Sequence, residues 1–383
     1  MARLLLNQRI APRQALRVWL GAFDFSSIPD LHWHAAGEEI QPEVVRPLQS
    51  ARTPILLDGH SPKVLTGVYE LPIPSGGTPP RALRVSASNT NVATLRPRLV
   101  PSKLVDAREK TLRVLLLSCF DWREDRAGRA SRLFTRIPAS QRPDLTVLMG
   151  DQVYLDLPTL ANFKKNAAWL AAKFERDYRR TWEAAEGLRE IFREAPSLCL
   201  PDDHEYWNNF PNPSPFVENT WTDDGRRNWR LAAGTLFEAF QQPWPTPPGE
   251  STIIDIAPLS FFLADSRTHR ERKTAGHTPQ AFGEPTVAAL ERWVERLERD
   301  DLLGVFITGQ SLFEEPRHGI KGTIADLQRA NHRHYQRIMK ALAGCPNRGR
   351  DILCITGDLH FGRVTRAGSP EHGLLYDVVS SPT

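Results

Sequence analysis

The amino-acid sequence predicts an α/β sandwich flanked by helices, preceded by a small all-β region. From about residue 110, apolar runs of strand length alternate with amphipathic helical stretches, which is typical of a layered α/β domain. Before that point, short β-like runs are separated by turns rich in Pro and Gly, and no long amphipathic helix is visible. In addition, polar side chains follow nearly every apolar run of the second part.

The first part, residues 1–108, is predicted to form a small domain like a β-sandwich. Its three histidines, His32, His34 and His60, are expected to lie on the surface or to pack, because no further ligand-type residues cluster with them. The segment 72–80 is a strong turn signal because it is rich in Pro and Gly. Strands are expected at residues 15–23, 54–57, 64–71 and 81–86.

The second part, residues 109–383, is predicted to form the α/β domain. Its near-continuous apolar runs indicate strands that are buried on both faces. Helices are expected over 286–299 and 324–343, where apolar residues recur at helical spacing, and over 163–192 as one long helix or two shorter ones. Strands are expected at 112–118, 145–150, 197–200, 260–264, 303–308, 352–356 and 374–379.

Composition points to an ordinary globular protein that favours anionic substrates. The 383 residues include 49 Lys and Arg against 45 Asp and Glu, and these charges are scattered along the chain. The net charge of +4 steers anions toward the protein. No apolar run could cross a bilayer, and the leucines near the start are too few for a secretory signal. The four cysteines form no C-x-x-C pair. A cytoplasmic protein without membrane contact is therefore expected.

The polar clusters at the strand ends are the most informative feature of the sequence. Because ligands bind beyond the carboxyl ends of strands in open α/β sheets, we expect these clusters to converge on one rim. A single aspartate after a strand is usually a turn former or a helix cap, but six clusters together favour a metal or phosphate site. The clusters are Cys119 with Asp121, Asp151 with Tyr154, Asp202 through Glu205, Asp265 with Arg267, Gln310, and Asp358 with His360.

These clusters occur in the order SC-x-D, GDQVY, DDHEYWNN, ADSRTHR and TGDLH. That order resembles the PhoD-like alkaline phosphatases, a branch of the calcineurin-like metallophosphoesterases. The resemblance covers roughly residues 110–383, and the N-terminal β-region is similar to the domain that commonly precedes this catalytic domain. It implies a metallophosphoesterase-like sandwich and two or more metal ions, Fe³⁺ together with Ca²⁺, with Mn²⁺ or Zn²⁺ as alternatives.

The ligand types at the matching positions agree with two different ions. A thiolate and a phenolate are strong anionic donors, and because free Tyr has a pKa near 10, a bound phenolate favours a strongly Lewis-acidic ion such as Fe³⁺. An all-oxygen set suits Ca²⁺, Mg²⁺ or Mn²⁺. By this resemblance Asp151 bridges the ions, and the full set of expected ligands is Cys119, Asp121, Asp151, Tyr154, Asp203, Asp358 and His360. Asp121 could instead cap a helix, and Cys119 and Tyr154 could instead pack.

The resemblance also assigns roles to the remaining polar residues. His204 is expected to act as the acid that assists the leaving oxygen. Arg267 and Arg270 are expected to bind the phosphate, because a guanidinium group matches phosphate oxygens in a bidentate way. Asn208 is expected to add an amide oxygen at the site or to shape the loop, and Gln310 falls where the superfamily has a lone metal-binding histidine.

The predicted function is a metal-dependent hydrolase of phosphoric esters, either monoesters or diesters, that works by in-line attack of metal-bound hydroxide. The alternatives are a nuclease or phosphodiesterase that acts on nucleic acid, and a metal-binding protein without catalysis. Nucleic acid is not favoured, because the arginines do not form a basic stripe. The Trp-rich stretch 206–248 is interpreted as a cover over the site or as a packed insertion.

Overall fold

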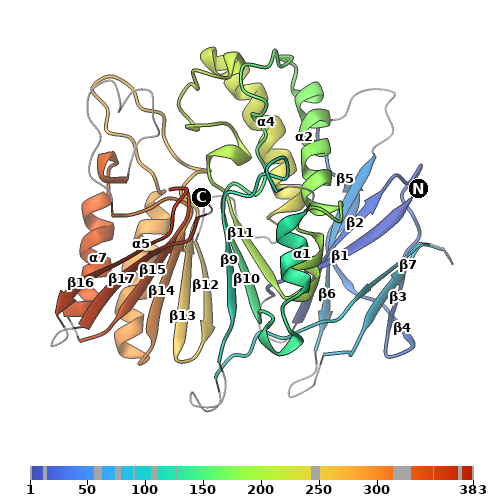
Figure 1. The fold of residues 1–383 in the computed structure, drawn as a ribbon, viewed down its shortest axis with the longest axis horizontal. Coiled ribbons are helices and arrows are strands. Elements are labelled where there is room, and N and C mark those ends of the chain that lie inside the picture. The colour runs from blue at the N-terminus through green and yellow to red at the C-terminus, as the bar shows by residue number, and fades with distance from the viewer. Residues whose placement is uncertain are drawn as a thin grey trace.

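The computed structural model describes residues 2–11, 15–55, 63–73, 79–88, 91–104, 111–125, 128–242, 251–313, 329–347, 349–369 and 373–381. Within these residues the chain forms two large sheets with helices outside both, and a small sheet built from N-terminal strands (Figure 1). The predicted α/β sandwich flanked by helices, with a β-rich N-terminal region, is therefore confirmed.

The first large sheet has seven strands and joins the two parts of the sequence. Its N-terminal strands are antiparallel to one another, whereas β1 pairs in parallel with β11 at Arg9 and Ser197. Strands β9, β10 and β11 are parallel, so their carboxyl ends lie at the same edge. The strand order is β5 (Glu43–Ser50), β6 (Val64–Pro72), β2 (Ala15–Phe23), β1 (Arg3–Arg9), β11 (Ser197–Leu200), β10 (Leu145–Met149) and β9 (Val114–Leu117).

The second large sheet has six strands and faces the first. Strands β13, β14, β15 and β17 are parallel, and the two edge strands, β12 and β16, are antiparallel to their neighbours. An apolar core fills the space between the sheets, with Val147 and Leu198 on one side and Val305 and Ile355 on the other. The strand order is β12 (Ser251–Ile256), β13 (Leu259–Ala264), β14 (Leu303–Thr308), β15 (Ile352–Thr356), β17 (Gly373–Val379) and β16 (Arg363–Ser369).

Helices cover the outer face of each large sheet. Helices α2 (Ala167–Trp182) and α4 (Asp223–Phe240) pack on the seven-stranded sheet, and α5 (Glu284–Arg299) and α7 (Tyr335–Asn347) pack on the six-stranded one. Local sequence starts these helices: the Asn166 side chain accepts hydrogen bonds from two N–H groups of α2, and α5 has Pro in its first turn. Shorter helices are α1 (Arg129–Thr135) and α3 (Arg189–Glu194).

The N-terminal strands divide their side chains between two cores, because successive residues of a strand point to opposite faces. Leu4 and Leu6 face the small sheet, whereas Leu5 joins the core beneath α2 and α4. The small sheet has the order β4 (Glu38–Ile40), β3 (His32–Ala35), β7 (Leu83–Ser86) and β8 (Val92–Leu95). The N-terminal region thus forms a sandwich that shares a sheet with the rest of the chain. A boundary near residue 108 stays a prediction, since residues 105–110 lie outside the described ones.

Most predicted elements are confirmed, and the differences have physical causes. The strands predicted at 15–23, 197–200, 303–308 and 352–356 have the observed bounds. The segment 163–192 forms two helices, α2 and α3. The helix predicted over 324–343 begins only at Tyr335, and residues 324–328 lie outside the described part. The prediction of a strand at 54–57 is wrong at Pro54, which lies in a turn. Residues 56 and 57 are outside the described part.

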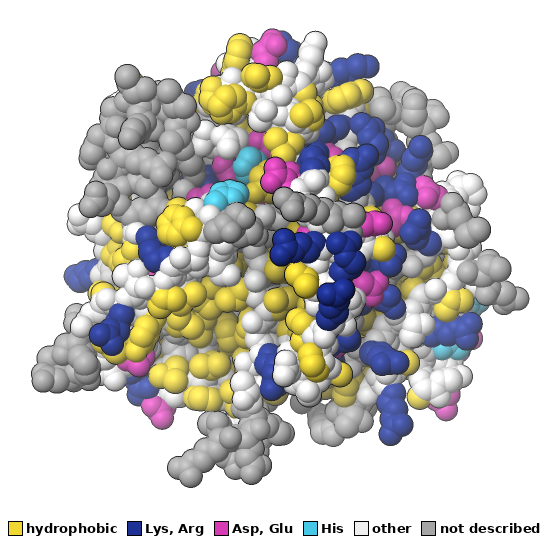
Figure 2. Space-filling model, in the orientation of Figure 1, with side chains coloured by type: hydrophobic (Ala, Val, Ile, Leu, Met, Phe, Trp, Pro, Cys, Tyr) yellow, Lys and Arg dark blue, Asp and Glu magenta, His cyan; other side chains and the backbone are white. Residues whose placement is uncertain are grey.

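The described part of the Trp-rich stretch, residues 206–242, packs into the core. Trp207 and Trp229 are fully buried in the core between the first sheet, α2 and α4, whereas Trp221 is exposed; Trp244 lies outside the described residues. Among the described residues, no helix is long and apolar enough to cross a membrane. Figure 2 shows hydrophobic side chains gathered over the strands on one face, with basic and acidic side chains mixed over α1 and α2.

Candidate metal centre

The candidate site lies where parallel strands of both large sheets end. Strands β9, β10 and β11 lead into Cys119, Asp151 and Asp203, and β13, β14 and β15 lead into three further polar segments. In the described part of the chain, ten residues other than glycine have a left-handed φ, and five of them lie here. This uncommon backbone conformation is often found at functional sites. The five are Cys119, Asp151, Asn209, Asp358 and His360.

Gly150 allows the first two strand ends to approach each other. Its φ is +102°, and a Cβ atom built on it would lie 2.3 Å from the Cβ atom of Asp202. Only glycine fits this conformation and this space, because any side chain would collide with the neighbouring strand end. The glycine therefore brings Asp151 and Asp202 side by side.

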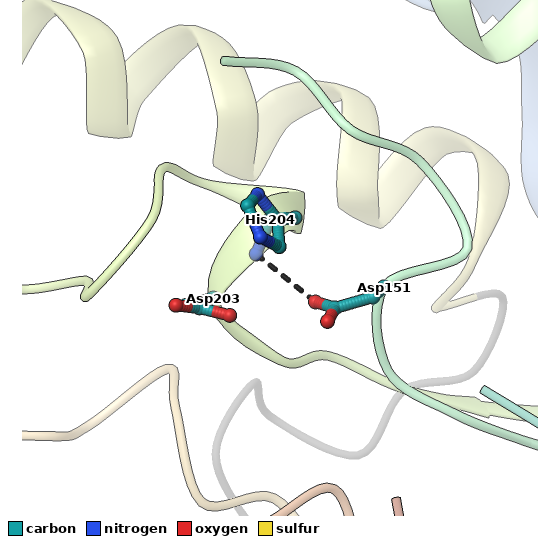
Figure 3. Close-up of side chains that lie close together, drawn as sticks. All are labelled: Asp151, Asp203 and His204. Carbon is teal, nitrogen blue, oxygen red and sulfur yellow. Dashed lines mark hydrogen bonds between the residues drawn. The ribbon is translucent and has the colours of Figure 1, made fainter. Parts of the chain in front are cut away.

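Carboxylates from three strand ends form the centre of the site. Two overlapping groups of side chains offer ligand atoms that all lie within 4.8 Å of one another: Asp151, Asp203 and His204 form one group, and Asp151, Asp202, Asp203 and Asp358 form the other. Asp151 and Asp203 belong to both groups. Figure 3 shows the carboxylates of Asp151 and Asp203 beside His204, whose backbone N–H donates to Asp151 Oδ1 over 3.1 Å.

The electrostatics of this cluster favour a bound cation. Asp151, Asp202 and Asp203 are at most 4% exposed. Burial first, and then the carboxylates of Asp203 and Asp202, raise the pKa of Asp151 well above its ordinary value, although His204 opposes this. Asp202 Oδ2 is buried and finds no hydrogen-bond partner among the described residues. Buried oxygens that repel one another are the donor set that a divalent or trivalent ion requires.

Glu205 ties two strand ends together beneath the carboxylates. Its Oε2 atom accepts hydrogen bonds from the backbone N–H groups of Asp151 (2.9 Å) and Asp202 (2.8 Å). Its Oε1 atom accepts from Gln152 N–H (2.7 Å) and from the Gln241 side chain (3.3 Å). Burial raises the pKa of Glu205 to about 7, although these donors oppose the shift. Glu205 therefore holds the turns that present both carboxylates.

His204 is oriented by a second carboxylate. Its Nδ1 atom lies 2.8 Å from Asp156 Oδ1, and Asp156 is buried. Asp156 Oδ2 accepts a hydrogen bond from Asn208 N–H over 2.8 Å. Burial by itself lowers the pKa of His204, but the carboxylates of Asp156, Asp203 and Asp151 raise it well above its ordinary value. With Nδ1 bound to Asp156, Nε2 is the ring atom left to serve as a ligand or a proton donor.

Arg267 lies behind the carboxylates. Its side chain is fully buried, its Nε donates to Asp202 Oδ1, and its Nη1 donates to the Phe210 carbonyl oxygen over 3.1 Å. Its Nη2 lies 3.8 Å from Asp203 Oδ1. The guanidinium group is therefore occupied by the acidic cluster, and this geometry favours a role in positioning Asp202 and Asp203 over the predicted contact with phosphate.

Three further predicted residues surround the centre without joining it. Arg270 is buried and its Nη2 donates to Gln310 Oε1, so the amide of Gln310 already has a partner in this arrangement. Asn208 is half-buried and contributes its backbone N–H to Asp156. The neighbouring residue Asn209, which the sequence did not single out, donates its N–H to Asp203 Oδ2 over 2.6 Å.

The residues expected to hold the iron-like ion are partly assembled. Cys119 is buried, with Sγ 3.7 Å from Asp151 Oδ2, and the Tyr154 ring lies 4.2 Å from the His204 ring. Burial, and then Asp151, raise the pKa of both Cys119 and Tyr154. His360 is exposed and is in neither group of ligand atoms. Asp121 Oδ1 accepts from Arg123 N–H over 2.9 Å, as a turn former does.

Three acidic residues that carry the site were missed as functional residues. Asp202 and Glu205 stand in the recognised run Asp202 through Glu205, but nothing in the run shows which carboxylate faces inward. Asp156 follows Tyr154 by two residues and could have been found as a further acid after the same strand. All three side chains are at most 1% exposed. Their burial is the signal that would have identified them, and the spacing of residues in a single sequence does not reveal burial in loops.

Comparison with solved structures places this site on a known architecture. The chain is similar to a structure of PhoD, with a TM-score of 0.67 over 98% of this chain and 76% of that chain, at 13% sequence identity. The chain shares the fold of PhoD. The fold expected from the strand-end motifs is therefore confirmed, and the carboxylate cluster lies at the carboxyl ends of the strands of that PhoD-like fold.

A second similarity is weaker. A dimetal phosphatase from Danio rerio gives a TM-score of 0.41 over 70% of this chain and 86% of that chain, at 9% identity, which is too low to establish a common fold. No family model and no curated protein sequence matches this chain.

Proposed function

We propose that this protein is a metal-dependent hydrolase of phosphoric esters. The observation that supports the proposal is the group of buried carboxylates from three strand ends, two of which belong to two overlapping sets of ligand atoms. Two-metal hydrolases need shared carboxylates of this kind to hold two ions a short distance apart. The PhoD-like fold of the chain supports the same reading.

The donors fit two ions of different character. Asp151 would be the shared ligand, and Asp202, Asp203 and Asp358 offer oxygens on one side, which suits Ca²⁺ or Mn²⁺. Cys119 lies beside Asp151 and Tyr154 lies beside His204, and both would ionise against a strongly Lewis-acidic ion such as Fe³⁺, with His360 as a further donor. When bound, the ions would generate a nucleophile from water and neutralise charge on the phosphoryl group.

The chain's own residues would position the substrate and move one proton. His204 is held by the contact between its Nδ1 atom and Asp156, and because its pKa is raised the ring would also carry a proton on Nε2, which can be donated to the leaving oxygen. Arg267 would keep Asp202 and Asp203 in place as ligands. Arg270 and Asn208 are the remaining proposed substrate contacts, although Arg270 must exchange its Gln310 partner to reach a phosphate.

Two other functions use the same residues. A phosphodiesterase or nuclease would hydrolyse diesters at the same ions. Figure 2 shows basic and acidic side chains mixed on one face, and such a mixture does not favour the binding of a nucleic acid to that face. A metal-binding protein without catalysis would bind ions but would not need a histidine that is held in one orientation. The paired Asp156 and His204 favour the enzyme.

The test is metal add-back on metal-stripped protein. Hydrolysis of p-nitrophenyl phosphate and bis-p-nitrophenyl phosphate would be measured with Fe³⁺, Ca²⁺, Mn²⁺ and Zn²⁺, singly and as the Fe³⁺ and Ca²⁺ pair. We expect turnover only with metal, and the ratio of the two substrates would separate monoesterase from diesterase activity. Stoichiometric metal binding without turnover on either ester would contradict the proposal and support the metal-binding alternative.

Removal of the Asp156 carboxylate tests the orientation of His204. In Asp156→Asn we expect kcat to fall on the order of 100-fold with KM and metal content little changed, because the imidazole loses its fixed tautomer and its charge partner. The alkaline limb of the pH profile of kcat should also move to lower pH, because the proton on His204 loses the carboxylate that raises its pKa. The matched control is Asp255→Asn, whose partner Arg296 lies away from the site. A kcat within twofold of the parent would contradict the role of Asp156 in orienting His204.

A further inference from the structure

A recess lies beside the segment that carries Asp203 and His204. It has a volume of about 960 Å³, within the range of small-molecule sites. One wall is the outward face of α4, the opposite wall is the segment Thr268–Arg272, and Tyr206, Trp207 and Phe210 lie at its base. The base belongs to the same segment as Asn209, whose N–H holds Asp203, so the recess and the carboxylate cluster share a wall.

The wall from α4 is open at its centre. Arg230, Leu231, Gly234 and Glu238 recur at helical spacing on the side that faces the recess. A Cβ atom built on Gly234 meets nothing within 4 Å, and Leu231 is 48% exposed. A glycine in the middle of a helix lowers the stability of the helix. Gly234 therefore leaves space in the recess at a cost in helix stability.

Arginines give the recess its charge. Arg226 and Arg227 form ion pairs with Asp223 and Asp224, and Glu271 is paired with His277 and Arg333. By contrast, no ion pair within 4.0 Å is found for Arg230 or Arg272 among the described residues, although Arg272 is close enough to Asp223 to help lower the pKa of that carboxyl. Among the described residues, five arginines line the recess against the carboxylates of Glu238 and Glu271, so positive charge is in excess there and attracts an anion.

Arg230 is already oriented for such a ligand. Its Nη2 donates to the Thr268 carbonyl oxygen over 2.9 Å, which links α4 to the opposite wall. Its guanidinium carbon lies 5.8 Å from the centre of the Phe210 ring. A guanidinium group held at one nitrogen keeps its other N–H groups in a fixed plane, which is the geometry that binds phosphate or carboxylate oxygens.

We propose that this recess binds a small molecule that carries a phosphate group and an apolar ring, with the phosphate at Arg230 and Arg272 and the ring against Leu231 and the space at Gly234. The proposal does not depend on the proposed hydrolase activity. The recess is lined by none of the residues in the two groups of ligand atoms, and Arg270 is the one lining residue that the proposed hydrolase also uses.

The test uses adenosine monophosphate and inorganic phosphate as probes on metal-free full-length protein. Without ions the carboxylate cluster repels anions, so binding reports on the recess alone, whether or not the protein is a hydrolase. Isothermal titration calorimetry should show saturable binding of adenosine monophosphate with one site and a Kd below about 1 mM. Inorganic phosphate should bind at least about tenfold more weakly, because it lacks the ring.

Two variants locate the site. Gly234→Leu fills the space and raises helix propensity, so the melting temperature of this variant should not fall. Arg230→Ala removes the proposed phosphate contact. Each substitution should weaken the binding of adenosine monophosphate at least about tenfold. Arg299→Ala, an exposed arginine at the end of α5, is the control and should bind normally. No saturable binding, equal binding of both probes, or unchanged binding in a folded Gly234→Leu protein would each overturn the proposal.

Discussion

Asp151→Asn is expected to remove metal-dependent hydrolysis, with kcat/KM lower by on the order of 1000-fold or more. The asparagine keeps the size of the side chain and can still accept the His204 N–H at Oδ1. It lacks the negative charge and the second anionic oxygen, and Asp151 belongs to both groups of ligand atoms. Both ions should therefore be lost or weakened together, which metal analysis of the purified variant would show.

The same substitution should not destabilise the metal-free protein. Because burial and neighbouring carboxylates raise the pKa of Asp151, its ionised form is unfavourable without ions, and a neutral asparagine relieves that repulsion. We expect the melting temperature of metal-free Asp151→Asn to equal or exceed that of the parent, whereas the increase on adding metal should disappear. Asp300→Asn, at the exposed end of α5, is the control. A variant that keeps two metal equivalents and a tenth of the activity would rule out Asp151 as the bridging ligand.

Glu205→Ala is expected to have the largest effect on folding. The Glu205 carboxylate accepts from the backbone N–H groups of Asp151, Gln152 and Asp202, and its removal leaves three buried donors without partners. Each such donor costs about 1–3 kcal/mol, so the free energy of unfolding should fall by roughly 4 kcal/mol once the cost of burying the carboxylate is offset. Urea denaturation of the metal-free protein measures this loss directly.

A surface glutamate provides the comparison for Glu205. Glu218 forms an exposed ion pair with Lys165, so Glu218→Ala should change the free energy of unfolding by less than about 1 kcal/mol. Because Glu205 is not itself among the ligand atoms, its loss should lower metal affinity only through the displaced turns. Equal stability of the Glu205→Ala and Glu218→Ala proteins would show that the turns after β10 and β11 hold their shape without this carboxylate.

Much of the sandwich follows from local patterns in the chain. The strands at 303–308 and 352–356 could be predicted because each is a continuous apolar run, and buried parallel strands require such runs. The place of Asp151 and Asp203 was also predictable, since a polar residue directly after a parallel strand must lie at the carboxyl edge of its sheet. The strand β1 was not predicted although it pairs with the neighbouring strand β2, and its parallel contact with β11, nearly two hundred residues away, leaves no local signal.

Other features of the site depended on contacts between distant segments. Arg267 was predicted to face phosphate because a guanidinium group suits phosphate, but its Nε donates to Asp202, and only the packing of β13 against the first sheet could show this. Likewise Asp156 and Glu205 are separated in sequence from the groups they hold, His204 and Asp151 respectively, by about fifty residues.

Hydrophobic periodicity and chain direction are enough to predict the element types, the α/β architecture and the residue types gathered at the strand ends. The folded structure was needed to show which carboxylates meet, which turns Glu205 holds, that Arg267 is buried against Asp202, and where the recess beside α4 opens. The physical reason is that side-chain direction and burial in loops are set by long-range packing, which no local pattern encodes.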